Sequence, residues 1–282
     1  MGKFDKFEGC GKVLSCPVCG KPLQLQERTL VCEKRHSFDL AKQGYVNLLL
    51  GGKPINEYTK VSFQERQQIL EKGMYAHLLQ EIREFLEATL QKGERKVLVD
   101  AGCGEGYYAR ELAAAFSEEL DVYGVDLSRD SIQIGAKSEP AHRVKWFVSD
   151  ISKLPVGDGA VDFLLDIFTS ANYQEFQRVL AEDGYLIKII PGEGHVKELR
   201  EAAKDQLYHK EYKERRGAEI FEEKFDVVLR KTVSATHPVT PEERDIFINM
   251  TPLLFQVDKT AIDWSGVTTI TVEGEVLIGK KK

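Results

Sequence analysis

Three closely spaced glycines directly after a strand-like run narrow the fold of this chain more than any other feature. The run covers residues 97–99, and the residues that follow read DAGCGEG, from Asp100 to Gly106. Glycines at alternate positions let the backbone turn sharply and approach a ligand closely, just before a helix begins. The spacing is GxGxG and not the GxGxxG of dinucleotide-binding enzymes. The sequence therefore predicts a nucleotide-type α/β fold whose ligand is not a dinucleotide.

Strand-like and helical segments alternate on both sides of this loop. Short β runs occur at 97–99, 122–125, 144–148, 161–165 and 185–190, with helical patterns near 107–117, 129–137 and 172–181. This order predicts a doubly wound, mostly parallel sheet of the Rossmann-like class, with helices on both faces. Ligands of such sheets bind beyond the carboxyl ends of the strands.

Acidic residues at the ends of three successive strands define the ligand further. They are Asp100, Asp126 (followed by Leu127) and Asp150 (followed by Ile151). Asp100 would pair with an ammonium group, while loop backbone N–H groups, over Gly102, Gly104, Glu105 and Gly106, would bind a carboxylate. A carboxylate about 20 residues after the loop accepts hydrogen bonds from ribose hydroxyls. Asp150 would accept from an adenine amino group, and Ile151 would form an apolar wall. We therefore expect S-adenosylmethionine rather than NAD; the alternative is an ordinary glycine turn with surface acids.

Two helices are expected before the glycine loop, over residues 53–92. Apolar residues recur at helical spacing on both sides of Gly73, which interrupts the pattern. This stripe is typical of core packing. Tyr75 begins the second helix, where residues of such folds often border the cofactor pocket.

Four of the five cysteines lie within the first 32 residues, and three of these form a metal-binding pattern. The pattern consists of Cys16, Cys19, Cys32 and His36. Three thiolates and one imidazole suit a single structural Zn²⁺ ion, held between short strands that turn near residues 27–28. Free thiols or a redox pair are the alternatives, and Cys10 lies outside the pattern. So small a lobe would take its folding free energy largely from the metal.

Composition separates the metal-binding lobe from the rest. The motif GGKP at 51–54 predicts a boundary, giving a zinc-binding lobe at 1–52 and a second domain at 53–282. Residues 1–60 contain ten Lys and Arg against six Asp and Glu, whereas the remainder carries a net charge of −10. A basic lobe indicates a surface for a polyanion or simply a solvated face. Lys42, Tyr45 and Asn47 could contact RNA bases, or their segment could pack the lobe onto the body.

No apolar run is long enough to span a bilayer, and the N-terminus lacks a secretory pattern. We therefore expect a cytoplasmic protein without a membrane partner.

The two motif sets together resemble the 23S rRNA guanine-N1 methyltransferases of the RlmA/TlrB type. The similarity covers essentially the whole chain. It includes residues 16–36, HSFDLAKQGYVNLL at 36–49, DAGCGEGYY at 100–108, PGEGHVKEL at 191–199 and NMTPLLF at 249–255. The resemblance implies a zinc-binding RNA-recognition lobe and an S-adenosylmethionine-dependent methyltransferase domain. It also implies methylation of N1 of a guanine in a 23S rRNA hairpin, a link to macrolide resistance, and a homodimer.

The same resemblance implies roles for particular residues. Cys16, Cys19, Cys32 and His36 would bind zinc, and Tyr75, Gly104, Glu105 and His195 would contact the cofactor. One position departs from the family pattern: Ser170, in DIFTSAN at 166–172, stands where a proline is usual. That segment is where the target base should be held.

Guanine N1 carries a hydrogen, so methylation needs a base that accepts it. Asp166, at the end of the fourth strand, is the candidate, although it could instead cap the next helix. The target base must be unpaired or extruded, because pairing blocks N1. Two alternatives remain: a small-molecule methyltransferase with a structural zinc knuckle, and a zinc-dependent RNA-binding protein without catalytic activity.

Overall fold

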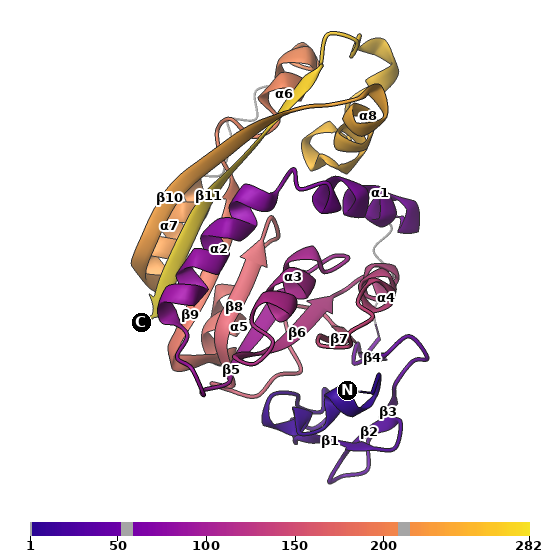
Figure 1. The fold of residues 1–282 in the computed structure, drawn as a ribbon, viewed down its shortest axis with the longest axis vertical. Helices are drawn as coiled ribbons and strands as arrows, with labels where there is room; N and C mark the ends of the chain where they lie inside the picture. Colours follow the sequence, from indigo (N-terminus) through magenta and orange to yellow (C-terminus); the bar gives the residue numbers. More distant parts are fainter. Residues whose placement is uncertain (1, 52–58, 208–214) are drawn as a thin grey trace.

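The computed structural model describes residues 2–51, 59–207 and 215–282 (Figure 1). Its strands are β1 (Leu23–Gln26), β2 (Thr29–Cys32), β3 (Ser37–Asp39), β4 (Tyr45–Asn47), β5 (Lys96–Ala101), β6 (Leu120–Asp126), β7 (Lys145–Val148), β8 (Val161–Ile167), β9 (Leu180–Pro191), β10 (Phe225–Pro238) and β11 (Thr269–Lys281). Its α-helices are α1 (Lys60–Glu71), α2 (Ala76–Thr89), α3 (Tyr107–Ala115), α4 (Arg129–Ser138), α5 (Tyr173–Val179), α6 (Lys197–Ala202), α7 (Arg215–Lys224) and α8 (Pro241–Met250).

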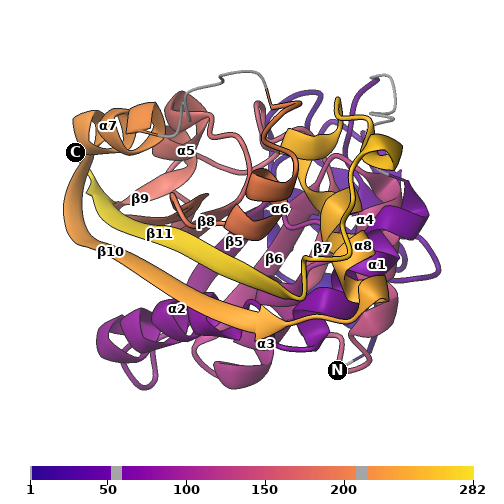
Figure 2. The ribbon, with the colours of Figure 1, turned by 90° about the horizontal axis from the view of Figure 1, so that it is seen from above.

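One large sheet organises the described part of the chain. Its eight strands run in the order β10-β11-β9-β8-β5-β6-β7-β4. The strands from β9 to β4 are parallel to their neighbours, whereas β11 is antiparallel to both β9 and β10. Figure 2 shows α2 and α3 on one face of this sheet and α5 and α7 on the other. The predicted doubly wound, mostly parallel sheet is confirmed.

Local sequence signals explain where several helices begin. Thr59 and Thr240 cap α1 and α8 through their side-chain oxygens, and Ser128 caps α4 in the same way. Such caps satisfy backbone N–H groups that the first helical turn leaves without partners. Figure 1 shows α1 above the carboxyl ends of the parallel strands, with α8 above α1. These two helices thereby cover the end of the sheet where ligands of this fold class bind.

Two parts of the sheet differ from the sequence-based prediction. The helix expected at 172–181 ends at Val179, because the chain is already extended and paired with β8 at Leu180. The long antiparallel ribbon of β10 and β11 was not predicted, nor was β4 at the opposite edge.

The N-terminal lobe is built on the three-stranded sheet β1-β2-β3. β1 and β2 form the predicted hairpin, with Glu27 in the turn at a φ of 55°. The chain then leaves the lobe through β4, which pairs with β7 of the large sheet. The proposed boundary at residues 52–53 lies outside the described residues.

The lobe and the large sheet also share a hydrophobic core. Buried side chains of the lobe, including Phe7 and Leu14, belong to the same cluster as Val125 and Phe147 of the sheet. Backbone hydrogen bonds join the two parts, such as Ser15 N–H to the Pro155 carbonyl at 2.9 Å. The lobe is therefore packed against the large sheet and is not an independent domain joined to it only by a linker.

This packing decides between the two interpretations of the segment around Tyr45. Tyr45 is only 2% exposed, and its hydroxyl accepts a hydrogen bond from Arg129 Nε at 2.9 Å. The expectation that Tyr45 could stack on RNA bases is therefore wrong, because its ring is enclosed by protein. Lys42 and Asn47 are exposed.

No helix among the described residues is long and apolar enough to cross a membrane.

Candidate cofactor and metal sites

A cavity of about 1610 Å³ lies at the carboxyl ends of the parallel strands. Its walls come from the glycine loop, α1, the segments after β6, β7 and β8, and the end of β9. Single residues of α5, α6 and α7, residues 204–207, and residues 252–253 and 255–257 complete them. The predicted cofactor residues found in its lining are Gly102, Gly104, Asp126, Leu127, Asp150 and Ile151. The structure therefore brings residues from three successive strand ends to one place, as the parallel topology requires.

Two glycines of the loop are required by close contacts. Gly102 has a φ of 75°, and a Cβ there would lie 2.9 Å from the side chain of Thr169. Gly106 has the same φ, and a Cβ there would overlap the indole ring of Trp146. Gly102 therefore lets the loop approach the segment after β8, whereas Gly106 serves the packing of α3 on the sheet and lies outside the cavity lining.

Most backbone N–H groups of the loop already have partners within the protein. Gly102 and Cys103 donate to the Val125 carbonyl, and Gly106 donates to the Cys103 carbonyl. Gly104 N–H donates to Asp126 Oδ2 at 2.8 Å. The sequence analysis expected this row of N–H groups to bind a ligand carboxylate, but in this structure these four groups hold the loop itself.

Asp126 has spare hydrogen-bonding capacity despite its role in the loop. Its Oδ1 accepts from Ser128 N–H at 2.7 Å, and its Oδ2 accepts from Gly104 N–H. An ionised carboxylate offers about four lone-pair sites, so about two remain for ribose hydroxyls. Burial raises the pKa of Asp126, and the N–H groups of Ser128 and Gly104 oppose that rise.

Two buried carboxylates and one arginine lie beside the loop. Asp100 is 2% exposed, its Oδ2 has no hydrogen-bond partner among the described residues, and burial raises its pKa to about 7. Glu105 is fully buried, and burial raises its pKa while Arg66 lowers it. Arg66 comes from α1, lines the cavity, and places its Nε 3.7 Å from Glu105 Oε2. Two acidic groups and one cation therefore lie close together beside the glycine loop.

Tyr75 and His195 belong to an aromatic cluster at the edge of the cavity. Their rings lie 6.4 Å apart, and both pack on Phe168, which lines the cavity. His195 Nδ1 accepts a hydrogen bond from the Glu273 N–H at 3.2 Å, and burial lowers the pKa of His195 to about 4. His195 is therefore neutral at pH 7. Neither Tyr75 nor His195 is in the cavity lining, so their contact with the cofactor stays a prediction.

Asp166, the predicted base, is fully buried and is paired with a lysine. Lys188 Nζ lies 2.6 Å from Asp166 Oδ2, and Lys188 lies in the cavity lining, whereas Asp166 does not. Burial raises the pKa of Asp166 to about 6, and the ammonium of Lys188 opposes that rise. The assignment of Asp166 as the general base also stays a prediction.

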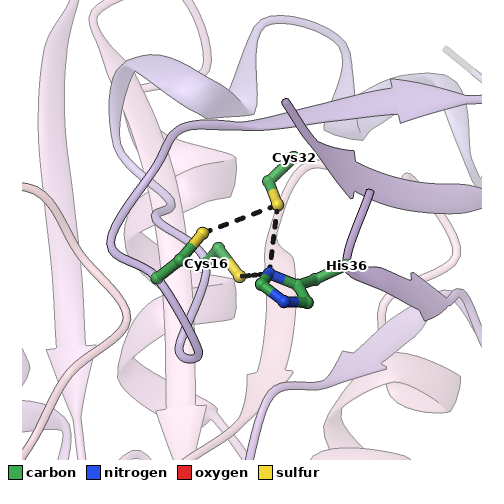
Figure 3. Close-up of side chains that lie close together, drawn as sticks. Cys16, Cys32 and His36 are labelled. Atoms are coloured by element: carbon green, nitrogen blue, oxygen red, sulfur yellow. Dashed lines mark hydrogen bonds between the residues drawn. The ribbon is translucent and has the colours of Figure 1, made fainter. Parts of the chain in front are cut away.

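The four predicted zinc ligands converge in the N-terminal lobe (Figure 3). Their ligand atoms all lie within 4.8 Å of one another. The sulfur-to-nitrogen distances from Cys16 and Cys32 to His36 Nδ1 are both 3.5 Å, and the sulfurs of Cys19 and Cys32 are 3.7 Å apart. A tetrahedral zinc ion with usual bond lengths requires about 3.6 Å and about 3.8 Å, respectively. The cluster therefore has the size and donor set of a closed structural zinc site.

Both implied groups fit the residues present. The zinc ligands have the spacing that the ion requires. At the other site, Asp126 presents a partly free carboxylate in the cavity lining, and the buried carboxylate of Asp100 lies just before the glycine loop, outside that lining. The fold and the two sites define a Rossmann-like, S-adenosylmethionine-dependent methyltransferase that carries an N-terminal zinc ribbon.

Comparisons with known proteins identify the family. The family described as "RlmA, N-terminal" matches residues 14–55, and the family described as "Methyltransferase domain" matches residues 98–184. The 23S rRNA (guanine(748)-N(1))-methyltransferase of Streptomyces fradiae is 32% identical over 80% of this chain and 81% of its own. YxjB of Bacillus subtilis (strain 168), provisionally named a 23S rRNA (guanine-N(1)-)-methyltransferase, is 30% identical over 94% and 96%. The chain belongs to the 23S rRNA (guanine-N1)-methyltransferase family.

A solved structure supports the fold alone. A chain from the complex of the Haloferax volcanii Trm112 methyltransferase activator with a methyltransferase aligns with a TM-score of 0.50 and 16% sequence identity. The alignment covers 82% of this chain and 99% of that one.

Three residues at the cavity were missed by sequence reasoning. Arg66, Phe168 and Lys188 all line it. Arg66 carries no local signal, because only the crossing of α1 over the strands brings it to the loop. Lys188 does carry a local sequence signal. It lies within the apolar run YLIKII and is therefore expected to be a buried charge, which needs a partner.

Proposed function

We propose that this protein transfers a methyl group to N1 of a guanine in a hairpin of 23S rRNA. The proposal rests mainly on the relationship to the Streptomyces fradiae enzyme over 80% of this chain, together with the match of the "RlmA, N-terminal" family to residues 14–55. The relatives named demethylmenaquinone methyltransferase align with only about a third of this chain, which favours an RNA substrate over a small molecule.

Several side chains are proposed to hold the cofactor. S-adenosylmethionine, when bound, supplies an activated methyl group on a positively charged sulfur. We assign the ribose to Asp126, the adenine to Asp150 and Ile151, and the ammonium to Asp100. Arg66 is assigned to the carboxylate, because its guanidinium faces Gly104 and the loop N–H groups are already engaged. The chain contributes chiefly alignment, since holding both reactants in place removes much of the barrier.

The zinc-binding lobe is proposed to attach the RNA. Lys34 and Lys42 are exposed on this lobe, and neither side chain has an ion-pair partner among the described residues. Unpaired cations on a lobe with a net charge of +4 over residues 1–60 suit a phosphate backbone.

The decisive experiment compares 23S rRNA from cells with and without the gene. A methyl group on N1 blocks the Watson–Crick edge, so reverse transcriptase should stop beside one guanine only when the gene is present. Mass spectrometry of the same fragment should show one added methyl group. If the two RNAs are identical, and ribosomal particles from several assembly stages accept no methyl group, a small-molecule acceptor becomes the better proposal.

Attachment of RNA through the lobe can be tested with point variants. Deleting the lobe would also remove the edge strand β4 from the large sheet. We expect Lys34→Gln with Lys42→Gln to weaken binding of the rRNA hairpin and to reduce the slope of log affinity against log salt by about 1–2. Lys92→Gln with Lys224→Gln, a change of two exposed lysines outside the lobe, is the matched control. Equal effects of the two double variants on a filter-binding or fluorescence titration would show that the lobe is not the anchor.

We also propose a cytoplasmic location, since the substrate is ribosomal RNA. The homodimer implied by the family resemblance stays a prediction, which sedimentation of the purified protein tests.

A further inference from the structure

A buried ion pair lies next to the cavity, and one of its two members, Lys188, forms part of the cavity lining. Lys188 lies on β9 directly opposite Asp166 on β8, in register in the parallel ladder. The lysine is 4% exposed and the aspartate is fully buried. Burying two charges costs free energy that the pair only partly regains, so such a pair is weak evidence for a purely stabilising role. Its place beside a ligand cavity calls for another explanation.

The hydrogen bonds of the Lys188 ammonium leave one donor. Its Nζ bonds Asp166 Oδ2 at 2.6 Å and the Thr169 carbonyl at 3.3 Å. An ammonium has three N–H donors. No other acceptor contacts Lys188 Nζ among residues 2–51, 59–207 and 215–282. Since Lys188 lies in the cavity lining, the third donor has the cavity as its available direction.

The order of the strands indicates that the third N–H group of Lys188 faces the base that receives the methyl group, and not the cofactor. The groups proposed for the cofactor follow β5, β6 and β7, whereas Lys188 lies on β9, on the other side of β8. Thr169, whose carbonyl holds Lys188, has its side chain against Gly102 of the cofactor loop. Lys188 is therefore close to the place where the methyl group is transferred, and it lies on the side of the target base.

We propose that Lys188 recognises the carbonyl oxygen O6 of the target guanine, with Asp166 as the positioning residue that orients the ammonium. The inference deepens the proposed function and rests on it. Guanine presents O6, a hydrogen-bond acceptor, next to N1, whereas adenine presents an amino group there. An ammonium opposite that amino group would face another donor. Lys188 thus selects a base that carries an oxygen at position 6.

The test uses two hairpin transcripts that differ at the position mapped as methylated, with guanine in one and 2-aminopurine in the other. 2-Aminopurine keeps the exocyclic amine at position 2 but lacks both O6 and the hydrogen on N1. Recognition of O6 is therefore measured by the change in preference between the wild-type protein and the Lys188 variant. For the wild-type full-length protein, we expect kcat/KM to favour guanine by about five- to thirtyfold, the lower part of the range for a specific base contact. In Lys188→Met, this preference should fall to less than about twofold.

Two further variants separate recognition from folding. Lys188→Met with Asp166→Leu removes the whole buried pair, so no charge is left without a partner, and it should show the same lost preference. Lys145→Met with Asp121→Leu changes a second lysine–aspartate pair of the same sheet, outside the cavity lining. That control should keep the wild-type preference even if it melts at a lower temperature.

The outcomes are distinct. If the Lys188 variants slow methylation of both transcripts by the same factor, Lys188 is structural and the proposal is wrong. It is also wrong if calorimetry shows that Lys188→Met weakens S-adenosylmethionine binding more than about threefold. If the wild-type protein methylates no 23S rRNA at all, the proposed function itself has failed.

Discussion

The zinc cluster and the cofactor cavity differ in how far apart their parts lie along the chain. All four metal ligands fall between Cys16 and His36, on one hairpin and its flanking turns. The cavity lining runs from Phe63 to Val257 and draws on strand ends, α1 and a C-terminal segment. A site of the first kind can be inferred from spacing alone, whereas a site of the second kind needs the topology of the sheet.

The two sites should also differ in how they respond to the loss of one residue. A closed metal site depends on a single ion, and every ligand contributes to the same binding event. In the cavity, the ribose, adenine and amino acid groups of the cofactor would each meet different side chains. Losing one ligand should therefore abolish zinc binding, while losing one cavity residue should weaken cofactor binding only in part.

The largest effect is expected at the zinc site. Cys32→Ser should reduce the zinc content from one ion per chain to almost none, measured by elemental analysis of the purified protein. It should also lower the melting temperature, because the lobe shares its core with the large sheet. S-adenosylmethionine affinity should change by less than about threefold, since no lobe residue within the described range 2–51 lines the cavity.

Cys10→Ser is the matched control for this change. Cys10 is equally buried, but its sulfur contacts the Leu23 carbonyl at 3.6 Å and lies outside the metal cluster. The control should keep its zinc. Full metal retention by Cys32→Ser would contradict the site, and a parallel loss of zinc and cofactor affinity would show that the two regions are not independent.

A smaller effect is expected from the acid after β6. Asp126→Ala should weaken S-adenosylmethionine binding by about 1–3 kcal/mol, the usual cost of leaving buried hydrogen-bond partners unsatisfied. That loss corresponds to about five- to 150-fold in affinity, measured by calorimetry. Asp130→Ala, an exposed acid on α4, should leave the affinity unchanged. If the Asp126→Ala variant binds S-adenosylmethionine as tightly as the wild type does, the assignment of the ribose to Asp126 is wrong.

The same contrast explains which features the sequence predicted. The zinc ligands, the glycine loop and the strand-end acids follow from spacing, because a hairpin and a parallel strand each impose a fixed local geometry. Arg66 and Lys188 could not be assigned in this way, since helix crossing and cross-strand register bring them to the cavity. For the same reason the sequence left two interpretations of the segment around Tyr45 open, and only the pairing of β4 with the large sheet decides for packing.

The sequence analysis also missed strands whose alternation of buried and exposed residues is weak. The ribbon of β10 and β11 forms one edge of the sheet, and β10 is largely exposed, so few buried positions mark its period. The roles of individual loop groups were likewise not readable from the motif. The row of glycines correctly indicated a sharp turn, but it could not reveal that its N–H groups bond to Val125 and Asp126.

The smallest expected effect is a pH dependence confined to the cavity. Burial raises the pKa of Asp100 to about 7, and only its ionised form can pair with the cofactor ammonium. Above pH 7 the carboxylate is mostly ionised, and below pH 7 it is mostly protonated. Affinity for S-adenosylmethionine should therefore fall as the pH is lowered from 8 to 6, by about three- to fivefold. Protonation of the carboxylate costs about tenfold over this range, and protonation of the cofactor amine, whose pKa is about 8, regains part of that loss.

Asp100→Asn isolates this effect, because the amide keeps the shape of the side chain and does not titrate between pH 6 and pH 8. The variant should bind weakly at pH 8 and lose the slope, whereas Asp130→Asn should keep the wild-type profile. Acid also protonates metal ligands, so zinc content must be measured at every pH. If the wild-type affinity for S-adenosylmethionine falls only at pH values where zinc is lost, the pH dependence is caused by the zinc-binding lobe. If it falls while zinc remains bound, and Asp100→Asn removes the fall, the cavity titrates on its own.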